Sequence, residues 1–312
     1  MNVEDRLAER FEEHRGHLRA VAYRMLGSLA EADDAVQEAW LRLARTAGDA
    51  EGSADAPIEN LGGWLRTVVS RICLDVLRSP RSQRVDLVGQ QVPDEAMTPG
   101  TGGTPGTPGT PEEEALTADS VGRALLVVLD TLTPPERVAF VLHDLFAVPF
   151  AEIAPIVDRS PVTTKKLASR ARGRVQGTPA LPPADLEAHR EVVEAFLAAA
   201  RGGDLTALLT ALAPDVVRRA DPATLPTGVA PEVRGAHEVA RETVLLRRNA
   251  QFAAAALVDG RPGIVVAPYG RLLIALRVRV AEGRVAEYEV IADQVRLAEL
   301  DLALLDQVVP AA

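Results

Sequence analysis

Residues 160–172 read SPVTTKKLASRAR, and they indicate a helix more clearly than any other stretch of the 312-residue chain. Ser160 is a favoured N-cap residue, and Pro161 suits the first helical position, where no backbone N–H is missed. Five basic residues and no acidic residue lie between Ser160 and Gly177, although the whole chain has a formal net charge of -10. The concentration of positive charge in one helix of an acidic protein indicates a specific role for that helix.

A short apolar segment, residues 149–157, precedes this helix, and Asp158 and Arg159 between them suit a turn. A short helix, a turn and a basic helix form a helix-turn-helix, whose second helix enters the major groove of DNA. Pro155 fits poorly, because a proline inside a helix typically costs about 3 kcal/mol. We therefore expect the first helix to bend or to begin late.

The basic helix has two interpretations. It is a solvated charged face, or it contacts base edges near its N-terminus and phosphates further along. The second interpretation predicts a DNA-binding set that consists of Ser160, Val162, Thr163, Lys165, Lys166, Arg170 and Arg172. Neutralising about five phosphates would give log K a slope of roughly −4.5 against log salt.

Composition narrows the function classes. Cys73 is the one cysteine, so an internal disulfide is excluded and a cysteine zinc site is implausible. No cofactor or metal is expected. The chain shows no signal-peptide pattern and no apolar stretch near the roughly 20 residues that span a bilayer, which predicts a cytoplasmic protein without membrane contact. Net acidity opposes nonspecific binding to nucleic acid, so we expect weak DNA binding without a partner.

The first block covers residues 5–84 and has three helical patterns. Apolar spacing predicts the first helix up to Gly27. Ser28 with Glu31 makes a capping-box pattern that starts the second helix, whose exposed side is acidic. A third apolar face runs from Trp64 to Val76. The block is therefore expected to be an all-helical domain.

Residues 85–114 separate this block from a second helical block, residues 115–177. Residues 98–111 read TPGTGGTPGTPGTP, a composition that cannot bury a core and predicts a mobile tether. In the second block, Thr133 and Glu136 form another capping box, with Pro134 at the first helical position. The helix-turn-helix ends the block.

A hinge, residues 178–186, leads to a third block, residues 187–312. Two helices come first, with Gly202 and Gly203 between them. Alternating apolar residues 272–280, a turn signal at Glu282-Gly283 and residues 285–291 then predict a β-hairpin. Helices followed by strands favour an α+β domain.

Three segments, taken in order, resemble one protein family. They read EADDAVQEAWLRL (residues 31–43), WLRTVVSRICLDVLRS (residues 64–79) and LTPPERVAFVLHDL (residues 132–145), the last followed by the helix-turn-helix. The chain up to residue 177 is thus similar to extracytoplasmic-function sigma factors, the transcription initiation subunits of bacterial RNA polymerase. The third block resembles a SnoaL-like, cystatin-type cone.

The resemblance implies a fold, a function and a set of sites. It implies two all-helical domains, sigma region 2 and sigma region 4, followed by the α+β cone. It implies a non-enzymatic factor that directs core RNA polymerase to promoters. The implied polymerase-binding residues are Asp33, Asp34, Gln37 and Glu38. The implied minus-ten residues, which read and melt promoter DNA, are Trp64, Arg66, Thr67, Arg71 and Arg78, and the basic helix would read the minus-thirty-five element.

Two alternatives stay open at this point. The chain could be a helix-turn-helix regulator that binds duplex DNA as a dimer without polymerase. The third block could be a small-molecule enzyme, with His237, Asp221, Tyr269 and Tyr288 as candidate residues, although these have no recognisable catalytic spacing. On the main interpretation that block regulates the factor in cis, by intramolecular docking or through a small-molecule ligand.

Overall fold

The computed structural model describes residues 3–50, 60–79, 120–221 and 230–305. The expected tether, residues 85–114, lies outside these residues. The chain divides into two compact units. The first combines Met1–Leu87 with Leu132–Gly173, and the second combines Val88–Thr131 with Arg174–Ala312.

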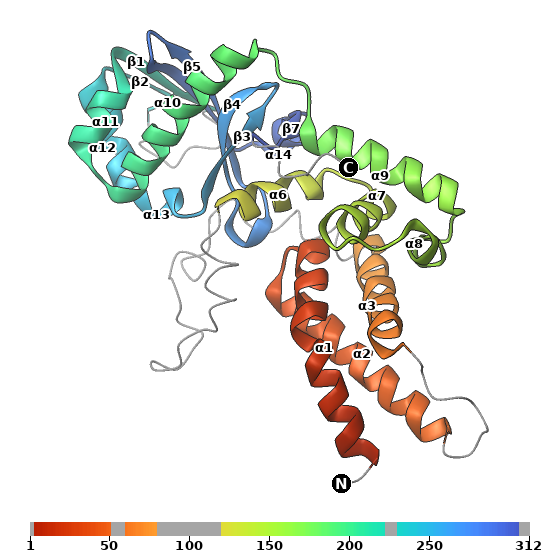
Figure 1. Ribbon diagram of the computed structural model, residues 1–312. Helices are drawn as coiled ribbons and strands as arrows, with labels where there is room; N and C mark the ends of the chain where they lie inside the picture. The colour runs from red at the N-terminus through yellow and green to blue at the C-terminus, as the bar shows by residue number, and fades with distance from the viewer. Residues whose placement is uncertain (1–2, 51–59, 80–119, 222–229, 306–312) are drawn as a thin grey trace. The chain divides into compact units, whose positions relative to one another are not determined.

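The first unit begins with three packed helices: α1 (Val3–Leu26), α2 (Leu29–Ala50) and α3 (Leu61–Arg78) (Figure 1). Gly27, with φ 77°, separates α1 from α2, as the sequence predicted. Ser28 Oγ accepts a 3.3 Å hydrogen bond from the Glu31 amide, so the expected cap of α2 is present. The predicted all-helical first block is confirmed.

The unit continues with α7 (Pro134–Phe140), a π-helical turn η2 (Val141–Leu145), α8 (Phe150–Val157) and α9 (Pro161–Gln176). Glu136 Oε2 accepts hydrogen bonds from the Thr133 amide and hydroxyl at 3.2 and 2.7 Å, as the capping box predicts. Pro155 lies inside α8, which nevertheless begins at Phe150 rather than late. Asp158 takes a left-handed conformation, with φ 56°, and ends α8.

The second unit contains a seven-stranded mixed sheet in the order β2-β1-β6-β5-β4-β3-β7. Its strands are β1 (Leu212–Ala220), β2 (Glu232–Arg234), β3 (Ala253–Val258), β4 (Arg261–Val266), β5 (Ile274–Ala281), β6 (Arg284–Ile291) and β7 (Leu302–Ala303). β1 and β6 are parallel, and the other pairs are antiparallel. Its helices, apart from α6, are α10 (Pro183–Gly202), α11 (Leu205–Ala211), α12 (Ala236–Leu245), α13 (Arg247–Ala250), η4 (Pro268–Gly270) and α14 (Gln294–Ala298).

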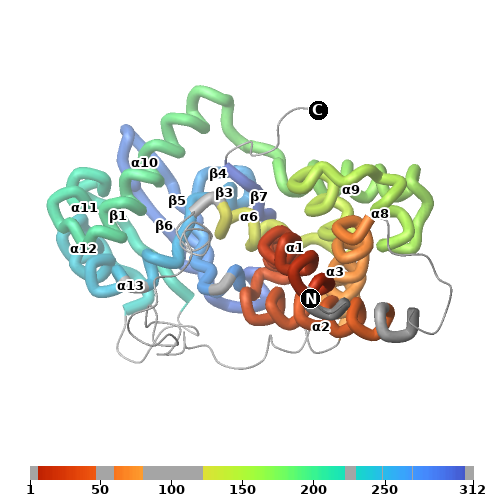
Figure 2. The backbone as a smooth tube through the Cα atoms, turned by 60° about the horizontal axis from the view of Figure 1, so that its bottom comes forward, coloured from red at the N-terminus to blue at the C-terminus, as the bar shows by residue number. Residues whose placement is uncertain are grey.

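The hydrophobic core of this unit lies between one face of the sheet and α10, α11 and α12 (Figure 2). Phe196 of α10 and Tyr288 of β6 meet there with ring centroids 5.7 Å apart. Positive φ angles at Glu282 and Gly283 close the β5–β6 hairpin at the predicted place. The α+β expectation for the third block is confirmed, and its SnoaL-like assignment stays a prediction.

Helix α6 (Ser120–Asp130) packs in the second unit, against β3 and β7. Six successive residues, 124–129, are buried, so α6 is covered on more than one side. The end of α9 meets the same region, because the Leu304 amide donates a 2.8 Å hydrogen bond to the Val175 carbonyl. The sheet of the third block thus holds helical segments that lie on both sides of the helix-turn-helix in the sequence.

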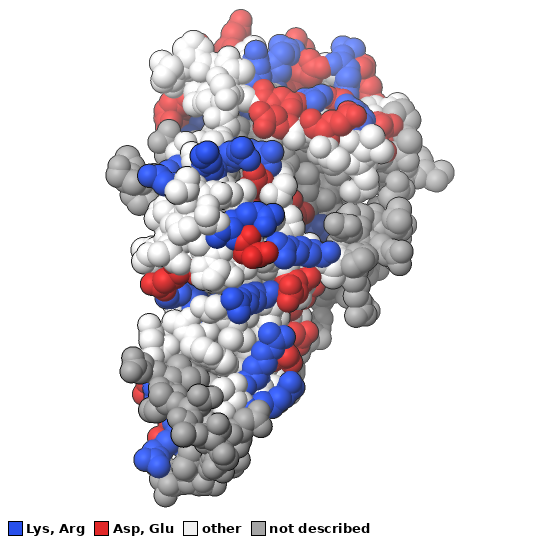
Figure 3. All heavy atoms as spheres, turned by 90° about the vertical axis from the view of Figure 1, so that its right-hand side faces the viewer, with Lys and Arg blue, Asp and Glu red and all other residues white. Residues whose placement is uncertain are grey.

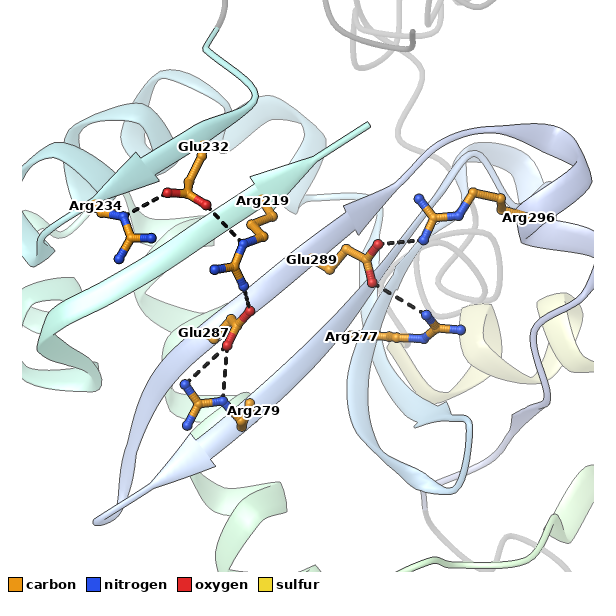
Figure 4. Close-up of polar contacts among 8 residues, drawn as sticks. All are labelled: Arg219, Glu232, Arg234, Arg277, Arg279, Glu287, Glu289 and Arg296. Atoms are coloured by element: carbon orange, nitrogen blue, oxygen red, sulfur yellow. Dashed lines mark hydrogen bonds and ion pairs between the residues drawn. The ribbon is translucent and has the colours of Figure 1, made fainter. Parts of the chain in front are cut away.

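The opposite face of the sheet carries an ion-pair ladder (Figure 4). Glu287 and Glu289 flank buried Tyr288 along β6, so strand alternation turns both carboxylates away from the core. Each glutamate in the ladder bridges two arginines. Glu232 pairs with Arg219 and Arg234, Glu287 with Arg219 and Arg279, and Glu289 with Arg277 and Arg296.

Candidate nucleic-acid interface

Helix α9 has two distinct faces. Thr164, Ala168 and Ala171, spaced by three or four residues, are fully buried. The exposed face consists of Val162, Lys165, Lys166, Ser169 and Arg170, followed by Gly173 and Arg174. No carboxylate of the described residues pairs with Lys165, Lys166 or Arg170. This is the arrangement that phosphate contact requires.

The start of α9 is rigidly built. Ser160 Oγ accepts a 3.2 Å hydrogen bond from the Thr163 amide, and the two hydroxyls lie 2.9 Å apart. The predicted N-cap is therefore present, and its hydroxyl is engaged within the turn. Thr164 Oγ1 donates to the Ser160 carbonyl at 3.0 Å, which fixes the same turn from the buried side.

Arg172 has a partner inside the first unit. Its Nε and Nη2 donate to Asp144 Oδ1 at 2.8 and 2.5 Å. The Asp144 side chain is only 3% exposed, and no described residue donates a hydrogen bond to its Oδ2. The pair joins α9 to η2. The DNA role expected for Arg172 stays a prediction, and the geometry gives this residue a packing role.

Most of the residues expected to contact the minus-ten element form a stripe along α3. Trp64, Thr67, Arg71 and Arg78 follow helical spacing, and Arg66 lies beside them. Arg71 and Arg78 are exposed, whereas Trp64 is half-buried. Thr67 Oγ1 donates to the Gly63 carbonyl at 2.9 Å, within its own helix.

Helix α8 lies beside this stripe (Figures 1 and 2). Arg66 Nη2 donates to Glu152 Oε2 at 2.5 Å, and Arg71 Nη2 donates to the Pro155 carbonyl at 3.2 Å. His17 stacks edge-on against Phe146 nearby. Partial burial lowers the pKa of His17, and the positive charges of Arg66 and His14 lower it further. These contacts were not expected from the sequence.

The expected polymerase contacts share one face of α2. Asp33, Asp34 and Gln37 are exposed there, and Glu38 is half-exposed. Asp33 is paired bidentately with Arg19 of α1, at 2.7 and 3.2 Å. Glu38 accepts from Arg42 one turn later, at 2.9 Å.

Sequence reasoning missed Leu41 on this face. It is 42% exposed, although it is a large hydrophobic residue. The sequence spacing could have placed Leu41 on this face, because Leu41 lies seven residues after Asp34 and therefore on the same side of the helix. Partial burial and the charge of Asp34 also raise the pKa of neighbouring Glu31.

The candidate enzymatic residues of the third block lie on separate elements. Tyr288 is buried, which raises the pKa of its phenol, and it bonds Thr243. Asp221 lies 3.8 Å from a guanidinium nitrogen of Arg296. His237 is exposed at a groove of about 340 Å³ that Glu238 and Arg284 also line. The side chain of Tyr269 is outside the described residues. Within the described ranges, no three His, Cys, Asp or Glu side chains gather as metal ligands would.

Comparisons with known proteins identify the family. Residues 10–83 match the model for sigma-70 region 2, and residues 122–175 match that for sigma-70, region 4. The ECF RNA polymerase sigma factor SigJ of Mycobacterium tuberculosis (strain ATCC 25618 / H37Rv) is 43% identical over 233 residues, which are 74% of this chain and 70% of SigJ. The chain belongs to the ECF RNA polymerase sigma factors.

A second relative of this ECF sigma factor is the probable ECF RNA polymerase sigma factor SigI of M. tuberculosis (strain CDC 1551 / Oshkosh). It is 33% identical over 222 residues, which cover 71% of this chain and 72% of SigI. The crystal structure of M. tuberculosis SigJ aligns with 93% of this chain and 97% of its own, at 34% identity and a TM-score of 0.44.

Membership in this family makes the chain a promoter-specific transcription initiation factor, whose partners are core RNA polymerase and promoter DNA, and whose relatives are non-enzymatic. The matched ranges contain α2 and α3 in region 2, and α8 and nearly all of α9 in region 4. They also contain all of α6 except its first two residues, and α6 packs on the sheet of the third block. Among the described residues, no helix has the length and apolarity to cross a membrane.

Proposed function

We propose that α9 reads the minus-thirty-five element, α3 reads and melts the minus-ten element, and the acidic face of α2 binds core polymerase. One observation supports this division most strongly: α9 exposes Lys165, Lys166 and Arg170, for which the described residues hold no carboxylate partner. Many other arginines of the chain are ion-paired, and on the face drawn in Figure 3 most blue side chains have a red neighbour.

The role of α3 rests on its stripe of exposed cations, Arg71 and Arg78, next to half-buried Trp64. Separated DNA strands are held by basic grooves and by aromatic side chains on which bases stack. Extruding a base costs a few kcal/mol, which such a surface offsets. Asp75 lies on the same stripe and opposes phosphate, which favours contact with bases over contact with the backbone alone.

The polymerase contact on α2 combines charge with an apolar centre. Asp34 and Gln37 are exposed beside Leu41. A few well-packed residues carry most of the energy of a protein interface, and a polar rim supplies orientation and on-rate. On this proposal Leu41 packs against polymerase, while Asp33 and Asp34 meet a basic polymerase surface.

The third block acts in cis on region 4. Its sheet packs against α6, and its Leu304 amide bonds the last turn of α9. Both helices fall inside or at the edge of the residues matched to region 4. The block is thereby joined directly to the end of the helix that reads DNA on this proposal, and tethering within one chain makes even a weak contact effective. We favour this intramolecular role over a small-molecule ligand, because the groove at His237 is open rather than an enclosed cavity.

Run-off transcription tests the assignment. The chain is assembled with bacterial core polymerase and used on genomic fragments to locate its start sites. Lys165→Ala with Lys166→Ala is expected to reduce the yield of specific starts strongly, because the phosphate contacts of α9 are lost. Arg71→Ala is expected to reduce strand opening on the same promoters while leaving closed-complex binding nearly intact.

Arg241→Ala is the control and, like Arg71→Ala, removes one positive charge; Arg241 is exposed on α12 and pairs with nearby Glu238 at 2.6 Å. Its start sites and transcript yields should equal those of the unmodified chain. Full activity of the Lys165/Lys166 double variant would refute the proposed role of α9. Specific binding to duplex DNA without polymerase, at half-sites one helical turn apart, would instead favour an ordinary dimeric regulator.

A further inference from the structure

Helix α9 exposes one large hydrophobic side chain, that of Val162, which is 69% exposed. The rest of its exposed face is polar or charged, or glycine, apart from Pro161 at the first turn. Single exposed hydrophobic residues are common on protein surfaces, so exposure alone assigns no role. Val162 differs from such residues in its place on the helix and in the stiffness of its surroundings.

Val162 is the second residue of α9 and follows Pro161, whose ring fixes the backbone. The Ser160 and Thr163 hydroxyls lock the same turn. A valine in a helix takes one dominant side-chain rotamer. Its two methyl groups therefore point in a fixed direction, and little conformational entropy is lost when they make a contact.

The N-terminal residues of the second helix in a helix-turn-helix reach base edges in the major groove. Nearly every group presented there is a hydrogen-bond donor or acceptor, and the exception is the 5-methyl group of thymine. Valine has no hydrogen-bonding side-chain atom. Among the base edges, a thymine methyl group is the partner that suits it, and a cytosine at that position would leave its amino group facing apolar atoms.

We propose that Val162 contacts a thymine methyl group in the minus-thirty-five element and so fixes one A·T pair of the recognised sequence. This rests on the proposed function of α9. Lys165 and Lys166, one turn further along the exposed face, hold phosphates or guanine edges beside that pair. Val162 is then a specificity-determining residue, whereas the two lysines mainly supply affinity.

The test replaces single thymines by deoxyuridine, which removes only the 5-methyl group. Duplexes carry a promoter located by run-off transcription, with each thymine of either strand of the minus-thirty-five element replaced in turn. The probe is the holoenzyme of the full chain and core polymerase. We expect about a four-fold loss of affinity at one position, because burying one methyl-sized group contributes about 0.8 kcal/mol and tenfold corresponds to 1.4 kcal/mol.

Val162→Ala removes the proposed contact from the protein side, as deoxyuridine removes it from the DNA side, and the two changes together form a double-mutant cycle. We expect this variant to lose a similar factor on the unmodified promoter and to be insensitive to deoxyuridine at the same position. Val295→Ala is the matched control, because Val295 is equally exposed in the second unit. That variant should keep the deoxyuridine sensitivity of the unmodified chain. Circular dichroism checks that all variants fold alike.

Three results would overturn the inference. They are a minus-thirty-five element without an A·T pair, a holoenzyme insensitive to deoxyuridine at every position, and a Val162→Ala variant that keeps the full sensitivity. Each of these still leaves a holoenzyme that binds promoters through α9. A failure of the proposed function is different, because the holoenzyme of the unmodified chain would then give no promoter complex that depends on Lys165 and Lys166, and both ideas would fall together.

Discussion

Glu152 of α8 accepts a 2.5 Å hydrogen bond from Nη2 of Arg66 on α3, across 86 positions of sequence. The same α8 offers the Pro155 carbonyl to Arg71. Two of the residues expected to contact the minus-ten element are therefore engaged by the first helix of the helix-turn-helix. In this arrangement region 2 and the helix-turn-helix of region 4 share one compact unit of the sigma factor.

On the proposed assignment of α3 and α9 to the two promoter elements, promoter geometry is incompatible with this contact. The two elements lie about 25 base pairs apart, which is roughly 85 Å of duplex at 3.4 Å per base pair. Helix α3 has 18 residues and so is about 27 Å long. It cannot touch α8 and the minus-ten element while α9 occupies the other site. We expect the contact between α3 and α8 to break when the chain assembles with core polymerase, before promoter binding.

The first prediction concerns Glu152→Gln, which removes the charge and keeps the shape of the side chain. Glu152 is 51% exposed, so the ion pair contributes at most about 1 kcal/mol. Loss of the pair should raise the affinity for core polymerase up to about five-fold, measured by fluorescence anisotropy of the labelled chain.

Arg66→Ala separates the two roles of Arg66. Assembly with polymerase should rise as it does for Glu152→Gln, whereas strand opening should fall because a minus-ten contact is lost. Unchanged or weaker assembly of Glu152→Gln would show that this contact does not restrain the free chain.

The second prediction concerns salt. Each phosphate contact contributes about −0.9 to the slope of log K against log salt. Lys165→Ala with Lys166→Ala should therefore make the slope of holoenzyme binding less steep by about 1.8, equally on matched and mismatched promoters. Filter binding between 50 and 200 mM salt, a range in which such slopes are resolved, measures it. An equal slope in the double variant would mean that these lysines do not reach phosphate, and Arg241→Ala should leave the slope unchanged.

The third prediction concerns the pair of Arg172 and Asp144. Removing one partner of a buried pair leaves a costly charge, so Arg172→Ala should reduce the free energy of unfolding by about 2–3 kcal/mol. Arg170→Ala, on the exposed face, should change it by less than about 0.5 kcal/mol. Chemical denaturation measures both.

Asp144→Ala in the Arg172→Ala background completes a double-mutant cycle. The double variant should be more stable than the sum of the two single losses predicts, because no unpaired carboxylate is left. Additive losses would contradict a direct interaction between the two side chains.

The fourth prediction concerns Gly177, which has φ 60° and would place a Cβ 2.4 Å from Ala303 Cβ. Gly177→Ala should weaken the bond between Leu304 and Val175 and speed exchange of the Leu304 amide hydrogen. Adding Ala303→Gly removes the overlap and leaves only the left-handed strain of about 1 kcal/mol. Slow amide exchange should then return in part. Exchange as slow in Gly177→Ala as in the unmodified chain would exclude this clash.

Local structure could be predicted where the residues that determine it lie within four positions of one another in the sequence. The caps at Ser28, Thr133 and Ser160 and the turn at Glu282-Gly283 depend on neighbours in sequence, and all four are present. The helix that contains Pro155 was harder to predict. The free-energy cost of a proline inside a helix is visible in the local sequence, but the packing that offsets this cost involves residues distant in sequence.

Contacts between residues far apart in the chain could not be predicted from the sequence. Arg66 and Arg172 were both expected to contact DNA, yet the carboxylates with which they pair lie 86 and 28 positions away. The residues of α6 are mostly apolar, but their sequence does not show that they pack against the sheet of the third block. The exposed face of α9 was predictable because helical periodicity separates it from the buried alanines.

The ladder of arginines and glutamates on the sheet has a consequence for how the chain behaves on a chromosome. Arg219, Arg277 and Arg279 are each satisfied by a carboxylate of the same face, so these cations present little uncompensated charge to a passing duplex. The free chain therefore binds DNA of arbitrary sequence weakly. Start sites are then located by the assembled holoenzyme, and the free chain is not held at random positions along the genome.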